Sequence, residues 1–207
     1  YQVYAKYKSG NYVGSDFDSL AVDGSPPLGA DGYGVSSTTA VQGVDANGTI
    51  TLSGNNSYSG ATTLNAGTLA LSGGNAIPDT SALTAASGSS FQLNASETIG
   101  SLAGGGNGAL QSNVLTAGGD NSSTSYSGVL SGTGGSLVKA GTGTLTLTGS
   151  SSFTGGSTLG AGTVIAGNAN ALGTAAVTLN DANTGSNNSS LLLNSLNFAR
   201  AITVANQ

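Results

Sequence analysis

Short runs of alternating apolar and polar residues occupy most of the chain, and most of these runs end at glycine, asparagine or serine. In TLTLT at residues 144–148, for example, Leu145 and Leu147 share one face of an extended strand and the threonines share the other. Such runs recur about every dozen residues from Val44 onward, which is the spacing of short strands joined by turns. We therefore predict an all-β protein, with helical structure limited to a turn near residues 78–82.

The predicted strands share this alternation and are bounded by turn-forming residues. They cover residues 49–53, 61–65, 68–72, 90–94, 108–110, 113–117, 129–131, 136–140, 144–148, 158–159, 163–166, 175–180, 190–194 and 201–205. Residues 1–8, YQVYAKYK, alternate in the same way and predict a further strand at the start of the chain.

An internal repeat organises part of this pattern. GTITLSGNNSYSGATTLNAGTL, which starts at Gly48, aligns without a gap with GTLTLTGSSSFTGGSTLGAGTV, which starts at Gly143. Most glycines and inward leucines of the two copies coincide, and Tyr58 aligns with Phe153. Repeated short strands separated by glycines are typical of a stacked β architecture, in which each turn of the chain lies on the previous one.

Composition favours a narrow coil over an antiparallel β-sandwich, although both produce short strands and frequent turns. Glycine is abundant, with 35 residues, whereas the chain holds only 7 Tyr, 4 Phe and no Trp to fill a sandwich core. We predict a β-solenoid domain over residues 44–207, with repeat copies at about 48–77 and 126–172. Turns of roughly 20–25 residues would make about six to eight coils. The sandwich remains the alternative at this point.

Residues 1–43 differ from the rest of the chain and predict an irregular, Tyr-rich N-terminal arm. Tyr1, Tyr4, Tyr7 and Tyr12 are concentrated there, and glycines and a proline pair interrupt any regular strand pattern after the first eight residues. Two roles remain open for this arm. It either forms a lid over the first coil, or it is exchanged with a neighbouring molecule, in which case the four tyrosines are assembly contacts.

Charge and composition exclude several classes of function. The net charge is −5 with only 4 Lys and Arg residues, too few to neutralise the phosphates of a nucleic acid. No apolar run approaches the ~20 residues of a membrane-spanning helix, and the first residues lack the apolar core of a signal peptide. Tyr1 is therefore expected to be either a mature terminus or a position inside a longer protein. Without Cys or His, we expect no disulfide, metal or cofactor.

Three patterns were weighed as catalytic or metal sites, and each has a simpler structural interpretation. Ser136 and Lys139 form an SxxK string, but in a strand their side chains point to opposite faces, whereas the corresponding catalytic motif requires a helix. The acids at positions 16, 18 and 23 lack the complete spacing of a calcium loop, as does Asp120 after two glycines. Glu97 is the only glutamate, so a carboxylate pair for glycoside hydrolysis is not indicated. We expect no enzymatic activity.

The second repeat copy resembles a known family. GTGTLTLTGSSSFTGGSTLGAGTV at residues 141–164 is similar to the passenger-associated strand repeat of bacterial autotransporters, the type V secretion family. ETIGSLAG at 97–104, GGDNSSTSYSGVLSGTGG at 118–135 and LVKAG at 137–141 extend the resemblance, which covers about residues 44–207. The first copy departs from the pattern, because VDANG at 44–48 replaces the expected KxGxG lead-in. Residues 1–43 do not resemble the repeat.

The resemblance implies a right-handed parallel β-helix that is exported across the outer membrane, with the repeat aiding folding and transport of the passenger. It implies a non-enzymatic structural or adhesive segment at an extracellular or bacterial cell-surface location, with host or cell-surface ligands as partners. The alternative is the subunit of an extracellular filament, in which copies stack end to end and exchange their N-terminal arms. A carbohydrate-active enzyme is a third class, supported only by analogy of fold.

Overall fold

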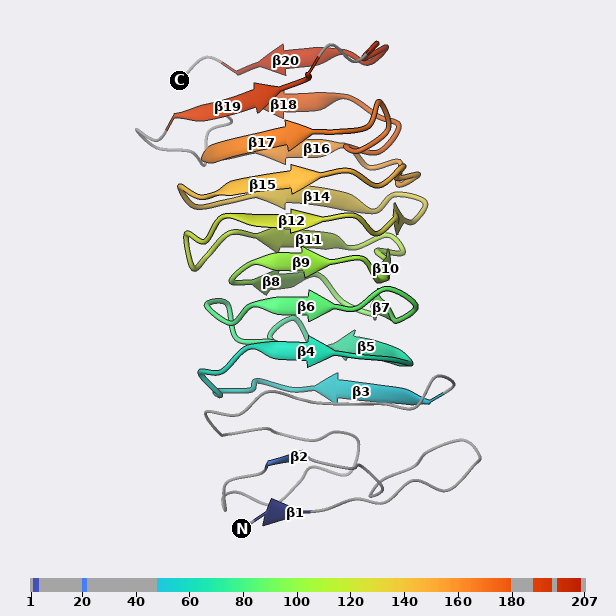
Figure 1. Ribbon diagram of the computed structural model, residues 1–207, viewed down its shortest axis with the longest axis vertical. Helices are drawn as coiled ribbons and strands as arrows, with labels where there is room; N and C mark the ends of the chain where they lie inside the picture. The colour runs from blue at the N-terminus through green and yellow to red at the C-terminus, as the bar shows by residue number, and fades with distance from the viewer. Residues whose placement is uncertain (1, 4–19, 22–47, 180–187, 195–196, 206–207) are drawn as a thin grey trace.

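The chain forms a right-handed parallel β-helix, as the family resemblance implied (Figure 1). The computed structural model describes residues 2–3, 20–21, 48–179, 188–194 and 197–205, and these contain strands and turns but no helix. As the chain climbs from the N-terminal to the C-terminal end in Figure 1, the nearer strands run to the right and the strands behind them run to the left. This sense of rotation makes the coil right-handed.

Three parallel sheets form the sides of the coil. Sheet I contains β3 (Thr49–Ser53), β5 (Thr68–Ser72), β7 (Ser90–Leu93), β10 (Asn107–Ala109) and β13 (Leu130–Ser131). Sheet II contains β4 (Thr62–Leu64), β6 (Leu83–Ala85), β9 (Leu102–Gly104), β12 (Thr124–Tyr126), β15 (Thr144–Leu147), β17 (Gly162–Ala166) and β19 (Ser189–Leu192). Sheet III contains β8 (Glu97–Ile99), β11 (Val114–Ala117), β14 (Ser136–Lys139), β16 (Ser157–Leu159), β18 (Val177–Leu179) and β20 (Ile202–Val204).

Within each sheet a strand pairs with the strands one turn earlier and one turn later, except for the outermost strands of that sheet, such as β13 in sheet I and β8 in sheet III. In sheet II, Thr62 pairs with Leu83, which pairs with Leu102, so that one turn takes about 20 residues. The described residues complete about six turns, in agreement with the predicted number. Because every one of these pairings is parallel, the sandwich alternative is wrong.

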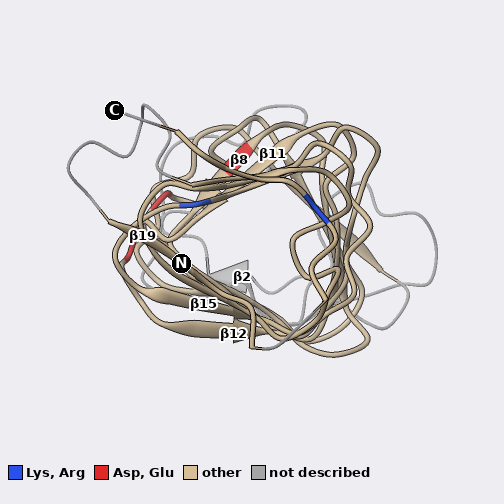
Figure 2. Ribbon diagram, turned by 90° about the horizontal axis from the view of Figure 1, so that it is seen from above, with Lys and Arg blue, Asp and Glu red and all other residues tan. Residues whose placement is uncertain are grey.

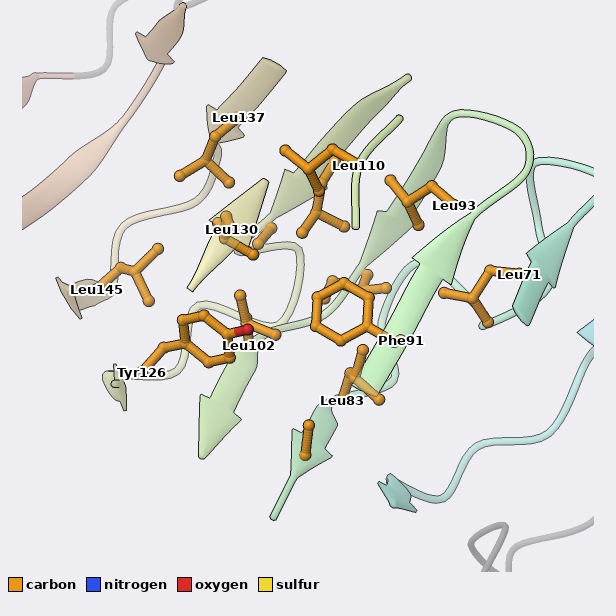
Figure 3. Close-up of a cluster of buried hydrophobic side chains, with 14 of the residues drawn as sticks. Leu71, Leu83, Phe91, Leu93, Leu102, Leu110, Tyr126, Leu130, Leu137 and Leu145 are labelled. Carbon is orange, nitrogen blue, oxygen red and sulfur yellow. The ribbon is translucent and has the colours of Figure 1, made fainter. Parts of the chain in front are cut away.

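The core is a column of stacked apolar side chains inside the coil. Leu52, Leu71 and Leu93 occupy one inward ladder of sheet I, and each is fully buried. Figure 3 shows the Phe91 ring among the buried leucines, with Leu83 and Leu102 of sheet II near it. Phe91 pairs with Gly108 on the next turn, and the ring occupies the space that a side chain at Gly108 would need. Gly108 thus leaves room for the Phe91 ring in the narrow interior of the coil.

Most predicted strands are confirmed within one or two residues, and two of them, β3 and β5, have the predicted bounds. Besides the two-residue β2 (Leu20–Ala21) of the N-terminal region, four strands of the coil, β6, β8, β9 and β12, were not predicted. Each has only three residues, and one or two inward side chains provide too little alternation to separate a strand from a turn. The predicted turn near residues 78–82 is present, with the Ser81 N–H donating to the Pro78 carbonyl at 2.7 Å.

The N-terminal region contributes one short antiparallel pair to the described residues. β1 (Gln2–Val3) pairs with β2 (Leu20–Ala21), and β1 lies within the strand predicted at the start of the chain. The tyrosines at positions 1, 4, 7 and 12 and the aspartates at positions 16, 18 and 23 lie outside the described residues. The two roles weighed for the arm, and its boundary at residue 43, therefore stay predictions.

Candidate functional site: repeat turns, buried charges and the open end

Each repeat copy spans one complete turn of the coil. In the first copy, the chain passes from β3 through a segment without a strand to β4 and β5, and β5 pairs with β3. In the second copy, β15 leads through a similar segment to β16 and β17, and β17 pairs with β15. The first and last strands of a copy are therefore direct neighbours, so each copy holds a complete parallel pairing within its own sequence.

One side of each repeat turn has no strand, and there an aromatic side chain fills the interior of the coil. Tyr58 and Phe153, which align in the sequence, are both buried. The Tyr58 hydroxyl lies 2.6 Å from Thr62 Oγ1 in a hydrogen bond, and burial raises the pKa of Tyr58 to about 12. Gly67 and Gly162, which also align, have positive φ values of 71° and 69° at the turn before the last strand. Local geometry is therefore preserved between the copies.

The two copies nevertheless lie on different sides of the coil. β3 and β5 belong to sheet I, whereas their counterparts β15 and β17 belong to sheet II. β4 belongs to sheet II and its counterpart β16 to sheet III. The second copy thus begins one sheet further around the coil axis than the first. It follows that the repeat specifies a strand–corner–strand–strand path but not the side of the coil on which that path begins.

Lys139 is inside the coil and Ser136 is not, which confirms that the two residues of the SxxK string point to opposite faces. Lys139 is 2% exposed and lies in an inward ladder between Ala117 and Leu159. Its Nζ donates hydrogen bonds to the carbonyl oxygens of Ala140 at 2.5 Å, Gly141 at 2.8 Å and Ala161 at 3.4 Å. Ser136 is half-buried on the outer face of β14.

The Lys139 ammonium therefore connects two successive turns of the coil. Ala140 and Gly141 follow β14 directly, whereas Ala161 precedes β17 one turn later. Three carbonyl acceptors match the three N–H groups of an ammonium, which makes this burial tolerable. Burial lowers the pKa of Lys139, and the charge of Asp120 partly opposes this shift. Because its ammonium donates to backbone oxygens of both turns, Lys139 joins these turns by hydrogen bonds and has a structural role.

We expect Lys139→Ala to lower the free energy of unfolding by about 3 kcal/mol, because it leaves a cavity and removes hydrogen bonds from buried carbonyls. Lys139→Met should cost less, since methionine restores most of the apolar stem and lacks only the ammonium. Urea unfolding followed by circular dichroism measures both. If Lys139→Met were as stable as the parent, the role of the ammonium in joining the two turns would be contradicted.

Glu97 is the second charged side chain inside the coil. It is 2% exposed, and its Oε1 accepts a hydrogen bond from the Ile77 N–H at 2.6 Å on the preceding turn. Oε2 has no hydrogen-bond partner among the described residues. Burial raises the pKa of Glu97, the Asp79 charge raises it further, and the backbone N–H groups of Ile77 and Ala76 oppose the shift. The orphaned oxygen and the raised pKa both favour the protonated carboxyl in the folded state.

The raised pKa of Glu97 predicts a loss of stability with rising pH. Between its unfolded-state pKa of 4.5 and its higher folded-state pKa, the folded chain binds more protons than the unfolded chain. The free energy of unfolding should therefore fall as pH increases through this window. We expect Glu97→Gln to remove this fall and to be more stable than the parent at neutral pH, because the amide oxygen keeps the Ile77 bond without a charge. Unfolding curves measured from about pH 4 to 8 test this.

Glu97→Leu is the matched control for that comparison. Leucine fits the inward ladder with Leu115, but it leaves the Ile77 N–H without its acceptor. The unmade bond should cost roughly 1–3 kcal/mol relative to Glu97→Gln. An unchanged pH dependence in both variants would contradict the assignment of the titration to Glu97.

Asp120, the other acid weighed as a ligand, is bound by its own chain. Its Oδ2 accepts from Ser101 Oγ at 2.6 Å, and its Oδ1 accepts from the Ser122 N–H at 2.8 Å. Across residues 48–179, 188–194 and 197–205, no group of three or more acidic side chains is arranged to hold a metal ion. Asp181 lies outside the described residues.

The C-terminal end of the coil is apolar and exposed. In the described part of the chain, the exposed large hydrophobic side chains are Leu192 at 41%, Ile202 at 42% and Val204 at 60%, and all three belong to the last two strands. At the opposite end, Ile50 and Leu52 in the inward ladders of β3 are 3% and 0% exposed.

Charged residues are few on the described coil and lie on one side of it. Viewed along the axis in Figure 2, the acidic and basic residues lie around sheet III and its adjoining corners, whereas β12 and β15 of sheet II on the opposite side are uncoloured. No helix long and apolar enough to cross a membrane occurs in the described residues.

This fold defines the class of the protein as a right-handed parallel β-solenoid. Two of its turns are formed by the repeat copies, and in each the first and last strands pair with one another. The family model described as passenger-associated-transport-repeat matches residues 47–71 and 137–166, which hold the strands of those two turns. These two regions are therefore similar to passenger-associated transport repeats, which confirms the resemblance seen in the sequence. The same family is typical of secreted or surface-exposed proteins. No curated protein and no solved structure gave a match.

Proposed function

We propose that the chain is a non-enzymatic structural or adhesive segment of an autotransporter-like surface protein, located outside a bacterial cell. The main support is that both passenger repeats form complete turns within one continuous coil. Such a coil is stiff, because parallel strand pairing continues from turn to turn in sheet II from β4 to β19. A stiff rod suits the role of a stalk that holds its outer faces away from a cell surface.

The placement of the ionisable groups supports a non-enzymatic role. Glu97 and Lys139 lie inside the coil, and both carboxylate oxygens of Asp120 accept hydrogen bonds from the chain. General acid–base chemistry requires such groups to reach a substrate. In this chain they are engaged in packing and in bonds between turns, and we expect the chain to function without a cofactor.

An adhesive role is supported by a row of hydroxyl groups on the outer face of sheet III. Thr98, Thr116, Thr158, Thr178 and Thr203 occupy successive rungs of one outward ladder, with Val138 in the remaining rung. Successive rungs lie about 4.8 Å apart, so the row presents regularly spaced donors and acceptors. Polar groups of a host or cell-surface ligand are suitable partners for such a row.

The filament alternative requires two complementary ends on each copy. The described coil exposes core side chains at its C-terminal end, whereas Ile50 and Leu52 of its first turn are buried. The two passenger repeats favour the stalk over the filament. The filament would regain support if purified chain formed rods longer than two molecules in electron micrographs.

Surface display tests the proposal. The chain is fused upstream of an autotransporter barrel in a Gram-negative host, and an N-terminal tag is probed with antibody on intact cells. We expect strong labelling that external protease removes, and attachment of these cells to host-cell matrix above that of cells displaying the barrel alone. Display without attachment would support the structural role. A tag that becomes accessible only after lysis would contradict the proposal.

A further inference from the structure

One outward ladder of sheet III has a β-branched side chain on every rung. We call it the threonine row, and its rungs are Thr98, Thr116, Val138, Thr158, Thr178 and Thr203. Branching at Cβ restricts χ1, and valine has the outline of threonine, so the shape of the row continues through Val138. At about 4.8 Å per rung the row is roughly 24 Å long. It runs along the side of the coil and therefore does not depend on where either end of the coil lies.

The five hydroxyl groups of the threonine row have no hydrogen-bond partner among the described residues. The other two sheets differ in this respect. In sheet I the outer hydroxyls bond to one another, with Thr68 Oγ1 lying 2.9 Å from Ser90 Oγ in a hydrogen bond. In sheet II the matching outward ladder is interrupted by Ala103 and Ile165. Sheet III therefore presents a row of hydroxyls that are free to bond with a ligand outside the chain.

The face around the threonine row is flat. Two residues after the rungs of β8, β11, β14 and β16, the side chain is absent or a single methyl group, at Gly100, Gly118, Ala140 and Gly160. Two residues before the rungs of β11, β14, β16 and β18 lie Val114, Ser136, Gly156 and Ala176. No side chain larger than valine therefore stands beside these rungs, and the continuous pairing from β8 to β20 keeps them in one sheet. A flat surface can approach all of the rungs together.

In the described strands of sheet III, the outer face carries no charge and no aromatic ring. Glu97 and Lys139, the charged residues of these strands, both point into the coil. Aromatic side chains of the coil are inside it as well, as for Phe91, Tyr126 and Phe153. A charged ligand would find no counter-charge on this face, and a sugar would find no ring on which to stack. The face matches a partner that is uncharged, flat and periodic.

We propose that the threonine row binds the surface of ice. A face of ice is flat and uncharged, and its water molecules repeat along one lattice axis at a spacing only slightly shorter than that of stacked strands. Hydroxyl groups spaced in this way can take the places of successive lattice waters, since each donates one hydrogen bond and accepts two. The methyl groups beside them order the water between the rungs, as apolar surface does. This inference goes beyond the proposed function, because ice is neither a host nor a cell-surface ligand.

Rigidity makes a row of weak contacts sufficient. A single exposed hydroxyl gains little when it exchanges one water molecule for another. The rungs are held in place by the sheet before binding, so that binding orders no further part of the chain. Contacts made by successive rungs therefore act as linked binding events, and the row holds an ice face more strongly than any one rung could. A long side chain on one interior rung should disturb the neighbouring rungs as well, because it keeps the ice face away from them.

Slow freezing of a solution of the complete 207-residue chain tests the proposal. The chain should enter the growing ice, whereas serum albumin in the same solution should stay in the liquid. A single ice crystal held in the solution should become faceted and should stop growing over a small temperature range below its melting point. Exclusion of the chain from the ice would overturn the proposal, and so would unrestricted growth of the crystal.

Two variants locate the contact on the threonine row. Thr116→Lys and Thr158→Lys each place a long charged side chain on an interior rung and should reduce incorporation into ice at least about fivefold. Thr146→Lys is the matched control on the outer face of sheet II, where Thr146 pairs with Ile165, and it should stay within about twofold of the parent. All three positions face outward, so folding should be retained, and circular dichroism confirms it.

The outcomes of the variants distinguish the row from other surfaces. Incorporation into ice that survives both Thr116→Lys and Thr158→Lys would overturn the assignment to the threonine row. A loss of the same size in Thr146→Lys would place the contact elsewhere and would likewise overturn it. The measurements use the purified chain and do not depend on export. A chain that is displayed on cells but excluded from ice would contradict this inference and leave the proposed function standing, and ice binding by a chain that is never displayed would do the reverse.

Discussion

Gly118→Ala is expected to lower the free energy of unfolding by at least about 4 kcal/mol, the largest effect of any single substitution proposed for this chain. Gly118 follows β11 with a φ of 130°, a conformation that residues with a side chain rarely adopt. A Cβ at this position would also overlap the carbonyl oxygen of Ala140 on the next turn. Backbone strain and a clash with a neighbouring backbone therefore add, and neither can be relieved by a side-chain rotation.

Gly88→Ala separates these two causes. Gly88 has a φ of 90°, but a Cβ there would meet no atom within 4 Å. We expect a loss of roughly 1–2 kcal/mol from strain alone. Thermal or urea unfolding of the two variants measures the difference. If Gly118→Ala were no less stable than Gly88→Ala, the close approach of successive turns at this corner would be contradicted.

Phe91→Ala is expected to cost about 3–5 kcal/mol, the range for a buried aromatic ring reduced to a methyl group. The ring is fully buried and lies between Leu69 and Gly108 in an inward ladder of sheet I. Gly108 has no side chain that could move into the vacated space. The cavity would therefore persist in the middle of the column, where Figure 3 shows the ring among buried leucines.

Two controls accompany the Phe91 substitution. Phe91→Leu keeps most of the apolar volume and should cost less than half as much as Phe91→Ala. Gln92→Ala changes the next residue, which faces outward on the same strand, and should stay within about 0.5 kcal/mol of the parent. Urea unfolding of all three gives the comparison. Similar losses at positions 91 and 92 would contradict the inward and outward assignment of β7.

The alternation of apolar and polar residues was sufficient to predict most strands of the coil. In β3 and β15, inward leucines and outward threonines identify both the strand and its buried face. Alternation failed in short segments such as β8 and β9, where an inward glutamate or a glycine breaks the pattern. There the chain is extended because strands of neighbouring turns hold it in register, β11 for β8, and β6 and β12 for β9.

The same alternation contained a signal for the buried charges. Lys139 shares its strand face with Leu137, and Glu97 shares its face with Ile99, so both charges are inward by period alone. Burial of a charge is costly without partners, and those partners are distant in the sequence. The Ile77 N–H and the Ala161 carbonyl come within reach only because the turns that carry them stack on Glu97 and Lys139.

By itself, the sequence determined that this chain is built of short strands with an internal repeat, because alternation and glycine spacing are local properties. Tertiary structure alone decided on which side of the coil each repeat begins. That choice depends on the number of residues in the turns between the two copies, and this number varies. The turn from Ser90 to its partner Asn107, for example, is shorter than the turn from Gly162 to its partner Ser189. It also decided that Ile202 and Val204 are exposed. Their pattern marks them as inward, and a side chain is buried only where another layer covers it.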